Sequence, residues 1–365
     1  MKEYITTLVR ERRIDDAPLV LRIVLHILSL IYATVTDIRN RLYDRNILKA
    51  RDVPCRIVSI GNLTVGGTGK TPVTIMTARI LVSGGCSVAV VSRGYGRRTT
   101  ETTVVSDGDR IHAGPDLAGD EPHLIAESLP GVPVVVGADR HLAAMTVYER
   151  FKPDVILLDD GFQHRRLNRQ VDIVTVDAHE PYGNGYVLPR GILRESPRGL
   201  SRAQAVVVTR CNEDTTRDHI ERLIRYYGRD VDIYWSAMVP SGLREPNTHE
   251  YRDLAVVAGM KVFALCNIAV PEQFHGMLAR LGASIVEYRC FEDHHRYTIE
   301  ELTRIEENAV QNDAGMIIMT AKDERNLPDG YVFSPLPAYV LDIDAQLLDH
   351  EHEYRAAVIP QHVSP

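Results

Sequence analysis

The sequence is poor in the features that mark several classes of protein. Its five cysteines lie far apart and form no C-x-x-C pair, which argues against a disulfide framework or a thiolate zinc site and favours a reducing compartment. Internal repeats and low-complexity tracts are absent. The apolar fraction of 44% and the charged fraction of 25% are typical of a folded globular chain rather than a disordered or polytopic membrane protein. A length of 365 residues predicts two domains, because single cores stop growing beyond roughly 250 residues.

The chain also lacks an excess of basic residues, since its net charge is −7. Residues 1–51 hold ten Lys and Arg against six Asp and Glu, so this end carries +4 and the remainder carries −11. Nonspecific nucleic-acid binding depends on clustered basic side chains, and we therefore expect no nucleic-acid partner. No signal peptide is predicted, because the apolar stretch starts only near Ala17, follows a charged run and has no small-residue cleavage site. We expect the protein to stay on the cytoplasmic side.

The amino-terminal apolar segment, residues 19–35, is interrupted by one polar stripe. A transmembrane span needs about 20 apolar residues, and the charge in the first turns makes spanning the weaker hypothesis. Two hypotheses stay open from the pattern: an amphipathic helix in the membrane interface with arginines flanking it, and a helix buried in an ordinary core. The stripe recurs at spacings of four and three residues, as on one helix face, and comprises Arg22, His26, Ser29, Ala33 and Thr36.

Beyond residue 51, short β-branched runs alternate with helical stretches. This alternation predicts βαβ units and a mainly parallel sheet with helices on both faces. A cluster of proline, glycine, serine and asparagine at 238–250 predicts a hinge or domain boundary, and the run 349–353 is expected to be a solvated tail. The predicted parts are a helical segment over 1–50, a larger α/β domain over 51–238 and a smaller α/β domain over 239–365. The predicted strands are 55–60, 87–92, 132–136, 155–158, 171–176 and 205–209 in the larger domain and 262–265, 284–288, 316–319 and 338–341 in the smaller one.

The sharpest motif follows the first predicted strand and precedes a helical run, which is the setting of a Walker A phosphate loop. In such a loop backbone N–H groups and the helix N-terminus bind phosphates, the lysine reaches the β and γ phosphates, and the hydroxyl ligates Mg²⁺. The strict pattern asks for glycine where Thr64 stands, and neighbouring glycines supply the turns instead. The motif therefore predicts a nucleoside triphosphate with Mg²⁺. Its cofactor-binding residues are Gly66, Gly67, Thr68, Gly69, Lys70 and Thr71.

The second half of such a site is an acidic residue at the end of a parallel strand. Asp159 and Asp160 follow the predicted strand 155–158, and one of them is expected to reach the metal or its water shell. The pattern leaves open which of the two does so. The alternative is a strand-terminating turn with Gly161.

Guanine selection is not supported by the sequence. The base-reading element of GTPases is Asn-Lys-x-Asp, whereas in the nearest string, residues 320–323, the lysine stands one place too late. The loop core is similar to that of partition and nitrogenase-like ATPases, but Val65 stands where their additional lysine belongs. These departures favour phosphoryl transfer over a regulatory switch.

Five ordered motifs together resemble the tetraacyldisaccharide 4′-kinase, or lipid A 4′-kinase, family. The similarity runs from about residue 47 to residue 210 and thins afterwards. It is carried by GNLTVGGTGKTP at 61–72, SRGYGR at 92–97, GDEP at 119–122, DDGFQH at 159–164 and LPRGILRE at 188–195.

The resemblance implies an α/β fold of the P-loop NTPase type with a second, smaller α/β domain and an N-terminal membrane-associating helix. It implies ATP and Mg²⁺ as cofactors, and transfer of the ATP γ-phosphate to the 4′-hydroxyl of tetraacyldisaccharide 1-phosphate. The implied partners are this lipid substrate and the membrane surface, with no obligate protein partner. The implied location is the cytoplasmic face of the bacterial inner membrane, as a peripheral or monotopic protein. The two remaining hypotheses are a membrane-docked nucleotide switch acting on a protein partner and a kinase for a soluble acceptor.

The resemblance also implies roles for particular residues. Asp120 is the candidate general base that accepts the sugar hydroxyl proton; the residues alone favour a helix N-cap at this position, and the resemblance reverses that preference. His294, with His295 as the adjacent possibility, is the candidate histidine that pairs with this base, and Lys70 completes the catalytic set. Glu195 is a candidate metal contact beside Thr71, Asp159 and Asp160. Arg93, Arg97, Arg140, Arg190 and Arg194 are expected to hold phosphates, and Gln163 and His164 either position the γ-phosphate or stabilise a turn.

Overall fold

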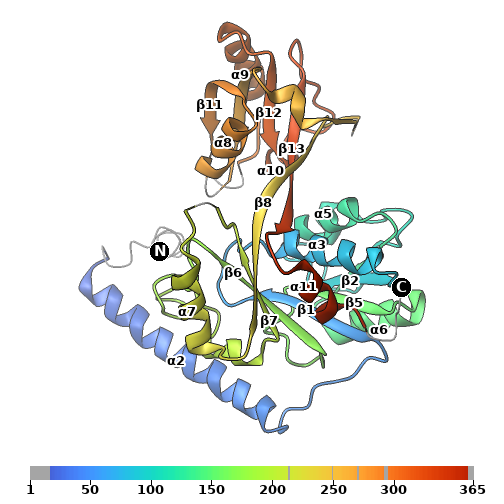
Figure 1. Ribbon diagram of the computed structural model, residues 1–365, viewed down its shortest axis with the longest axis vertical. Coiled ribbons are helices and arrows are strands. Elements are labelled where there is room, and N and C mark those ends of the chain that lie inside the picture. The colour runs from blue at the N-terminus through green and yellow to red at the C-terminus, as the bar shows by residue number, and fades with distance from the viewer. Residues whose placement is uncertain (1–16, 213, 249, 269–270, 292–294, 361–365) are drawn as a thin grey trace. The chain divides into compact units, whose positions relative to one another are not determined.

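The computed structural model describes residues 17–360 except 213, 249, 269–270 and 292–294. The chain forms two compact units (Figure 1). The first comprises Met1–Ala237 with Ala345–Pro365, and the second comprises Met238–Asp344. The chain passes between the units twice, within strand β8 (Asp232–Arg244) and within strand β13 (Ala338–Leu347).

The sheet of the first unit is parallel except at one edge. Its strand order is β8-β7-β6-β1-β5-β2-β4-β3, and β3 alone among these runs antiparallel to its neighbour. The strands are almost wholly buried, as expected where helices cover both faces. The α/β fold with a mainly parallel sheet is confirmed. The bounds are β1 Arg56–Asn62, β2 Val88–Ser92, β3 Thr103–Ser106, β4 Val134–Val136, β5 Val155–Asp159, β6 Val171–Asp177 and β7 Ala205–Thr209.

Helices cover the two faces of this sheet as separate layers. Helix α3 (Lys70–Ser83) packs on β1, β5 and β2, and α11 (Glu351–Val358) packs on α3. On the opposite face, α6 (Arg140–Phe151) and α7 (Arg217–Tyr227) bury apolar side chains against the sheet. The carboxylate of Asp139 starts α6 by accepting hydrogen bonds from two N–H groups of the first turn. The shorter helices of this unit are α4 (Pro115–Ala118), α5 (Asp120–Ser128) and the 3₁₀ turn η2 (Pro197–Arg202).

The second unit repeats the arrangement at smaller size. Its strands run in the order β11-β10-β12-β13 and are parallel to one another, and β8 pairs antiparallel with β9. Helix α8 contributes Phe274 and Met277 to one core, and α9 contributes Leu302 and Ile305 to another. The bounds are β9 Tyr251–Arg252, η3 Leu254–Val257, β10 Lys261–Cys266, α8 Pro271–Arg280, β11 Ser284–Cys290, α9 Ile299–Gln311, β12 Met316–Thr320 and α10 Ala321–Glu324.

All ten predicted strands are present; the departures are the edge strand β3, which was not predicted, and the chain at the junctions between the units. Strand β8 continues through Pro240 and Gly242, where the composition predicts a break, because burial of Leu243 and pairing with β9 override the local signal. The run 349–353 is mostly exposed, as expected, but it is not a tail. It leads into α11, in which Tyr354 is fully buried and lies 2.6 Å, oxygen to oxygen, from the Thr77 hydroxyl. The chain from Ala345 onward therefore belongs to the first unit, which differs from the predicted second domain over 239–365.

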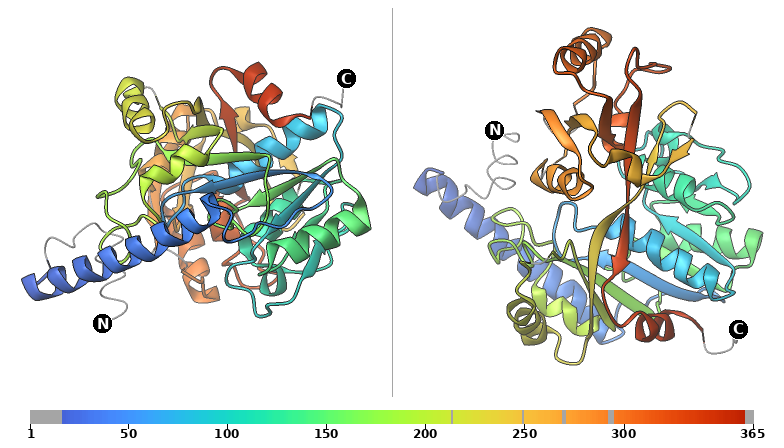
Figure 2. Two further views of the ribbon diagram at one scale, coloured as in Figure 1. Left: turned by 90° about the horizontal axis from the view of Figure 1, so that it is seen from below. Right: turned by 45° about the horizontal axis from the view of Figure 1, so that its top comes forward.

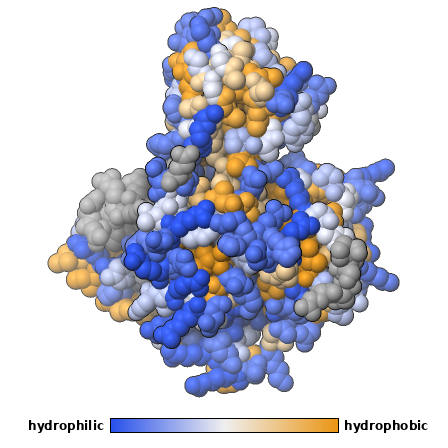
Figure 3. Space-filling model, in the orientation of Figure 1, coloured by the Kyte–Doolittle hydropathy of each residue, from blue (hydrophilic) through white to orange (hydrophobic). Residues whose placement is uncertain are grey.

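Helix α2 (Leu19–Asp44) presents its polar stripe to the protein and its apolar residues to the surroundings. In this helix only Leu25 and Ser29 are buried, so the hypothesis of a helix inside an ordinary core is wrong. The Ser29 hydroxyl donates to the Val187 carbonyl at 2.8 Å, and Asn40 donates to Glu195 at 2.8 Å. Figure 2 shows the amino-terminal half of α2 extending away from the sheet, and Figure 3 shows apolar surface at that end.

The apolar face of α2 is continuous along most of the helix. Among the described helices, α2 is the one long and apolar enough to cross a membrane by length and composition. The polar contacts of its stripe occupy one side with protein, so the apolar side is the exposed side. The exposed large apolar residues of α2 are Leu19, Val20, Ile23, Val24, Ile27, Leu28, Leu30, Ile31, Val35 and Ile38.

Candidate active site

The phosphate loop has the predicted frame of strand, loop and helix. Strand β1 ends at Asn62, and α3 begins at Lys70. Gly66 and Gly69 have φ values of 104° and 74°, a left-handed backbone that glycine adopts without a steric penalty. Lys70 and Thr71 are each 7% exposed, at the first turn of α3. The loop therefore directs N–H groups and a helix N-terminus toward the space above β1, where phosphates bind in such folds.

Threonine hydroxyls from two neighbouring strands hold this loop. The Thr209 hydroxyl donates to the Thr68 carbonyl at 2.9 Å, and the hydroxyls of Thr68 and Thr175 lie 2.8 Å apart. The Thr175 hydroxyl donates onward to the Gly61 carbonyl at 3.2 Å. Sequence reasoning missed Thr175 and Thr209. Both lie near the carboxyl ends of strands, as Asp159 does, but a single hydroxyl at that position is not by itself a signal.

A guanidinium also borders the loop. The side chain of Arg210, which follows β7, would lie 3.5 Å from a Cβ added at Gly67. It donates to Asp177 at 2.6 Å. The family resemblance carried no role for Arg210, although its place just after a parallel strand could have pointed to it.

The phosphate loop contacts two of the other motifs, the fifth (188–195) and the fourth (159–164). Val65 N–H donates to the Ile192 carbonyl and Arg194 N–H donates to the Leu63 carbonyl, both at 2.7 Å. A Cβ at Gly61 would stand 2.6 Å from the Cβ of Phe162, so only glycine admits this approach. The motifs at 159–164 and 188–195 are therefore both in contact with the phosphate loop.

The second and third motifs join the same assembly. The Ser92 hydroxyl, at the end of β2, donates to Asp159 at 2.9 Å. Gly119 approaches the Tyr95 carbonyl so closely that an added Cβ would lie 2.8 Å from it. Gly119 directly precedes Asp120, so the tertiary structure brings all five motifs together at one edge of the sheet.

The two neighbouring aspartates have opposite electrostatic environments. Asp159 is 1% exposed, and its pKa is raised by burial and by the nearby carboxylates of Glu121 and Asp160. Burial also acts to raise the pKa of Asp160, but the charges of Lys70 and Arg194 lower it overall. The Lys70 ammonium lies 3.9 Å from Asp160, and one Arg194 nitrogen donates to both of its oxygens at 2.7 and 2.9 Å. In this state Asp160 is therefore the aspartate held ionised by direct ion pairs.

The pKa values of Arg140 and His164 are also shifted by burial and by neighbouring charges. Burial, then the charge of Arg93, lowers the pKa of Arg140 to about 10, while Asp160 and Asp159 oppose the change. Its buried Nε has no hydrogen-bond partner among the described residues. Burial and the charge of Arg140 lower the pKa of His164 to about 4, so this imidazole is neutral at pH 7. A buried guanidinium with an unused donor suits binding of an anion.

The Glu195 carboxylate accepts hydrogen bonds from three side chains. Arg202 donates to its two oxygens at 3.0 and 2.9 Å, and Gln163 donates to it at 3.1 Å in addition to Asn40 of α2. Gln163 also donates to the Asn62 carbonyl at 2.7 Å, so its side chain stabilises the turn beside β1. The expectation that Glu195 contacts a metal stays a prediction.

The remaining predicted site residues are distributed as follows. Asp120 is the first residue of α5 and is exposed, with Gly119 at the preceding N-cap position. Arg190 donates to Nδ1 of His26 on α2 at 2.6 Å, and its guanidinium lies over the ring of Tyr186. His294 lies outside the described residues. His295, in the second unit, lies 3.2 Å from Glu301 and stacks on Phe291. The pairing of Asp120 with a histidine stays a prediction.

The donor set fits Mg²⁺ held together with a triphosphate. Mg²⁺ binds through one or two carboxylates, a hydroxyl and phosphate oxygens rather than through a cage of protein ligands. Thr71 would supply the hydroxyl, and Asp159 or Asp160 would supply the carboxylate at the end of β5. Over the part of the chain that the structure describes, no group of three or more His, Cys, Asp or Glu could hold a metal ion.

The fold and this site define a P-loop nucleotide-binding protein with a phosphoryl-transfer type of site and an exposed apolar helix. A family model, tetraacyldisaccharide-1-P 4′-kinase, matches residues 21–361. The chain belongs to the tetraacyldisaccharide 4′-kinase family.

Individual relatives and one solved structure agree. The tetraacyldisaccharide 4′-kinase of Syntrophus aciditrophicus is 42% identical over 344 residues, covering 92% of this chain and 91% of that protein. The corresponding protein of Halothermothrix orenii is 34% identical over 364 residues, with 95% and 94% covered. The crystal structure of LpxK from Aquifex aeolicus in complex with ATP aligns with a TM-score of 0.74 at 29% identity, over 93% of this chain and 98% of that one.

Proposed function

We propose that this chain is an ATP- and Mg²⁺-dependent kinase that phosphorylates the 4′-hydroxyl of tetraacyldisaccharide 1-phosphate in lipid A biosynthesis. The observation that carries the proposal is the meeting of the phosphate loop, Asp160 and Arg194 in a chain whose relatives bear that name. The exposed apolar face of α2 agrees with a lipid acceptor, because a multiply acylated substrate does not leave the bilayer.

The residues divide the work between donor and acceptor. Gly66 to Thr71 would hold the triphosphate, and Lys70 would neutralise its developing charge. Mg²⁺, when bound, supplies charge neutralisation on the phosphates and is held by Thr71 with Asp159 or Asp160. Asp120 would accept the proton of the attacking hydroxyl, with His294 orienting it. Catalysis would thus consist of positioning and electrostatic stabilisation.

The enzyme would act as a peripheral protein at the cytoplasmic face of the inner membrane. The apolar face of α2 would enter the acyl boundary, while the polar stripe stays against the protein. A kinase for a soluble acceptor would not require an exposed apolar helix face.

The test uses the full chain with Mg²⁺ and ATP labelled at the γ-phosphate. A kinase moves the label into a chloroform-soluble product of the disaccharide lipid, whereas a nucleotide switch releases inorganic phosphate. Lys70→Ala is expected to abolish transfer, and Lys49→Ala, an exposed lysine outside the site, serves as the matched control. Release of all label as inorganic phosphate by the wild type in the presence of the lipid would contradict the proposal.

The role of Asp120 has its own test. Asp120→Ala is expected to slow single-turnover transfer about 100-fold or more while leaving ATP affinity within about twofold, because general bases contribute roughly 10²–10⁴ to rate. Asp116→Ala, which removes an exposed carboxylate paired with Arg98, is the control. Wild-type single-turnover rates for Asp120→Ala would remove it from the base role.

A further inference from the structure

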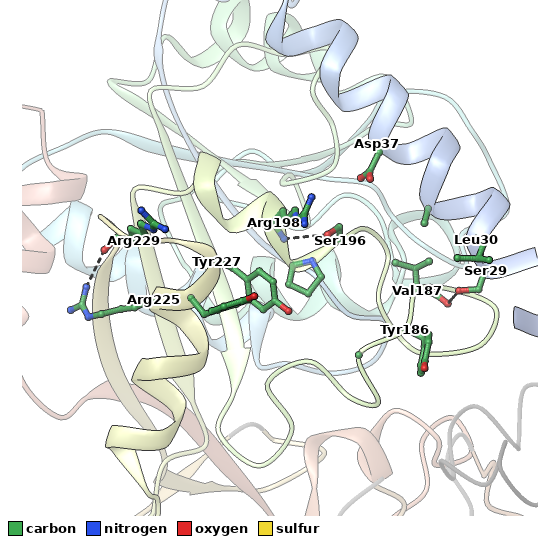
Figure 4. A pocket seen from close by; sticks show the side chains of 14 residues that line it. Ser29, Leu30, Asp37, Tyr186, Val187, Ser196, Arg198, Arg225, Tyr227 and Arg229 are labelled. Atoms are coloured by element: carbon green, nitrogen blue, oxygen red, sulfur yellow. Dashed lines mark hydrogen bonds between the residues drawn. The ribbon is translucent and has the colours of Figure 1, made fainter.

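A cavity of about 680 Å³ lies between α2, the loop 185–198 and the carboxyl-terminal end of α7 (Figure 4). No residue of the phosphate-loop motif, 61–72, lines this cavity. Its wall from α2 includes Ser29, Leu30 and Asp37, and its opposite wall includes Tyr226 and Tyr227. The cavity belongs wholly to the first unit.

The arginine side of the cavity lies at the edge of the sheet opposite the phosphate loop, whereas Val187 and Ser196 on its other side flank the fifth motif, 188–195, which contacts that loop. Strands β8, β7, β6 and β1 are neighbours in the sheet, and each pair is parallel. The first residues of these strands therefore lie at one edge of the sheet and their last residues at the other. Arg229 lies three residues before the start of β8, at the amino edge. The phosphate loop follows the end of β1, at the carboxyl edge.

The charge of the lining is positive. Arg198, Arg225 and Arg229 contribute three exposed guanidinium groups against the single carboxylate of Asp37. Arg225 is partly neutralised, because its Nε donates to Glu221 at 2.7 Å. Within the described part of the chain, Arg198 and Arg229 have no carboxylate within ion-pair distance. Two uncommitted guanidinium groups at one cavity suit a phosphate.

Fixed polar contacts form the wall beside α2. Val187 accepts the hydrogen bond from Ser29, which ties the loop to the helix. The Arg190 guanidinium lies 3.6 Å from the centroid of the Tyr186 ring, and the His26 ring meets the same tyrosine edge-on at 5.8 Å. This side of the cavity is therefore built by specific contacts rather than by chance packing of surface side chains.

The cavity borders the apolar face of α2. Leu30, which is 55% exposed, belongs both to the lining and to that face. Tyrosines with an apolar ring and a polar hydroxyl favour the level of lipid head groups, and Tyr186, Tyr226 and Tyr227 line the cavity together with the arginines. An occupant with a phosphate at the arginines and hydrocarbon along Leu30 would satisfy both parts of the surface.

We propose that this cavity binds the phosphate head group of an anionic glycerophospholipid of the bilayer, at a site separate from the acceptor site. The proposal rests on the membrane docking of α2 proposed above and adds a specific lipid contact to it. Acyl chains of the bound lipid would run beside the apolar face of α2, and the arginines would set the depth and orientation of the enzyme at the surface.

The experiment compares the full-length wild type with Arg198→Gln/Arg229→Gln by co-sedimentation with vesicles. Vesicles of phosphatidylcholine alone are compared with vesicles that also contain phosphatidylglycerol. The matched control is Arg110→Gln/Arg222→Gln, which removes two exposed arginines, one of them on α7, that do not line the cavity. The wild type is expected to bind the anionic vesicles more tightly, and the cavity variant is expected to lose about 30-fold of that binding, roughly fivefold for each arginine. The control is expected to lose less than about threefold.

Three results would overturn the proposal. Equal losses in the two double variants would mean general electrostatic attraction. Competition of vesicle binding by inorganic phosphate, with no dependence on phosphatidylglycerol, would mean a site for free phosphate. A raised KM for the acceptor in neutral detergent micelles that contain no phospholipid would assign the cavity to the acceptor.

The kinase activity in those micelles also separates this proposal from the proposed function. Unchanged phosphorylation by the cavity variant with reduced vesicle binding supports the site. A wild type without kinase activity that nonetheless binds anionic vesicles through these arginines would contradict the proposed function and leave the lipid site standing.

Discussion

The apolar face of α2 allows a quantitative prediction. Ile23 and Ile27 are each 51% exposed and lie one turn apart. Full burial of such a side chain is worth about 1.5–3 kcal/mol, so transferring the exposed half of each into the acyl region stabilises membrane binding by about 1 kcal/mol. Ile23→Ser/Ile27→Ser is therefore expected to weaken partitioning by about 2–3 kcal/mol, or roughly 30- to 150-fold. Serine and isoleucine have similar helix propensities, so α2 should persist.

Partitioning is measured by co-sedimentation with phosphatidylcholine vesicles, which keeps head-group charge out of the comparison. Folding is measured by urea denaturation of the same variant, and its free energy of unfolding is expected to change by less than about 0.5 kcal/mol. Leu25→Ser is the control, because Leu25 is 2% exposed on the protein-facing side of the same helix. That change is expected to lower the free energy of unfolding by about 2–5 kcal/mol, provided that α2 unfolds with the first unit.

The outcome that would refute this reasoning is specific. If Ile23→Ser/Ile27→Ser left vesicle partitioning unchanged but lowered the free energy of unfolding, the face would be packed against protein rather than lipid.

Three further predictions follow from the first unit. Thr209→Val removes the hydroxyl that holds the Thr68 carbonyl, and ATP affinity measured by titration is expected to fall roughly 2- to 12-fold. The control is Thr215→Val, which removes a half-buried hydroxyl that bonds within its own turn, to Asn212. Tyr354→Ala is expected to lower the free energy of unfolding in urea by about 3–5 kcal/mol, whereas His352→Ala, on the exposed side of α11, should cost less than about 0.5. The pKa of His164 is about 4 in the folded chain against about 6.5 unfolded, so the unfolded chain binds the proton first and stability falls as pH drops from 6.5 to 4. Allowing for its partial exposure, this loss is about 1–2 kcal/mol, and denaturation of His164→Gln at several pH values should show a flatter profile.

Much of the larger unit could be predicted because its signals are local. Buried parallel strands consist of short β-branched runs, and each predicted strand is present within a few residues of its expected bounds. Strand β3, by contrast, is a four-residue edge strand with two half-buried positions, so it carries little apolar signal. Strand β8 contains residues that usually end a strand, and only its partners explain why it continues.

The candidate site was predictable to the extent that it consists of motifs. The phosphate loop and Asp159 with Asp160 follow strands in a recognisable frame. The threonines that hold the loop were not predicted, because a single hydroxyl at a strand end has no meaning until the neighbouring strand is known. Arg190 shows the converse, since it lies within a motif but its partner is His26 of α2.

The sequence by itself determined the alternation of strands and helices, the phosphate loop and the polar stripe of α2. Each of these is a periodicity or a spacing within one short segment. Only the tertiary structure decided which side of that stripe meets the protein, since Ser29 and Asn40 find their partners more than 150 residues away. The same holds for the opposite environments of Asp159 and Asp160. Their pKa directions depend on burial and on charges brought from Glu121, Lys70 and Arg194, which are distant in the chain and adjacent only in the fold.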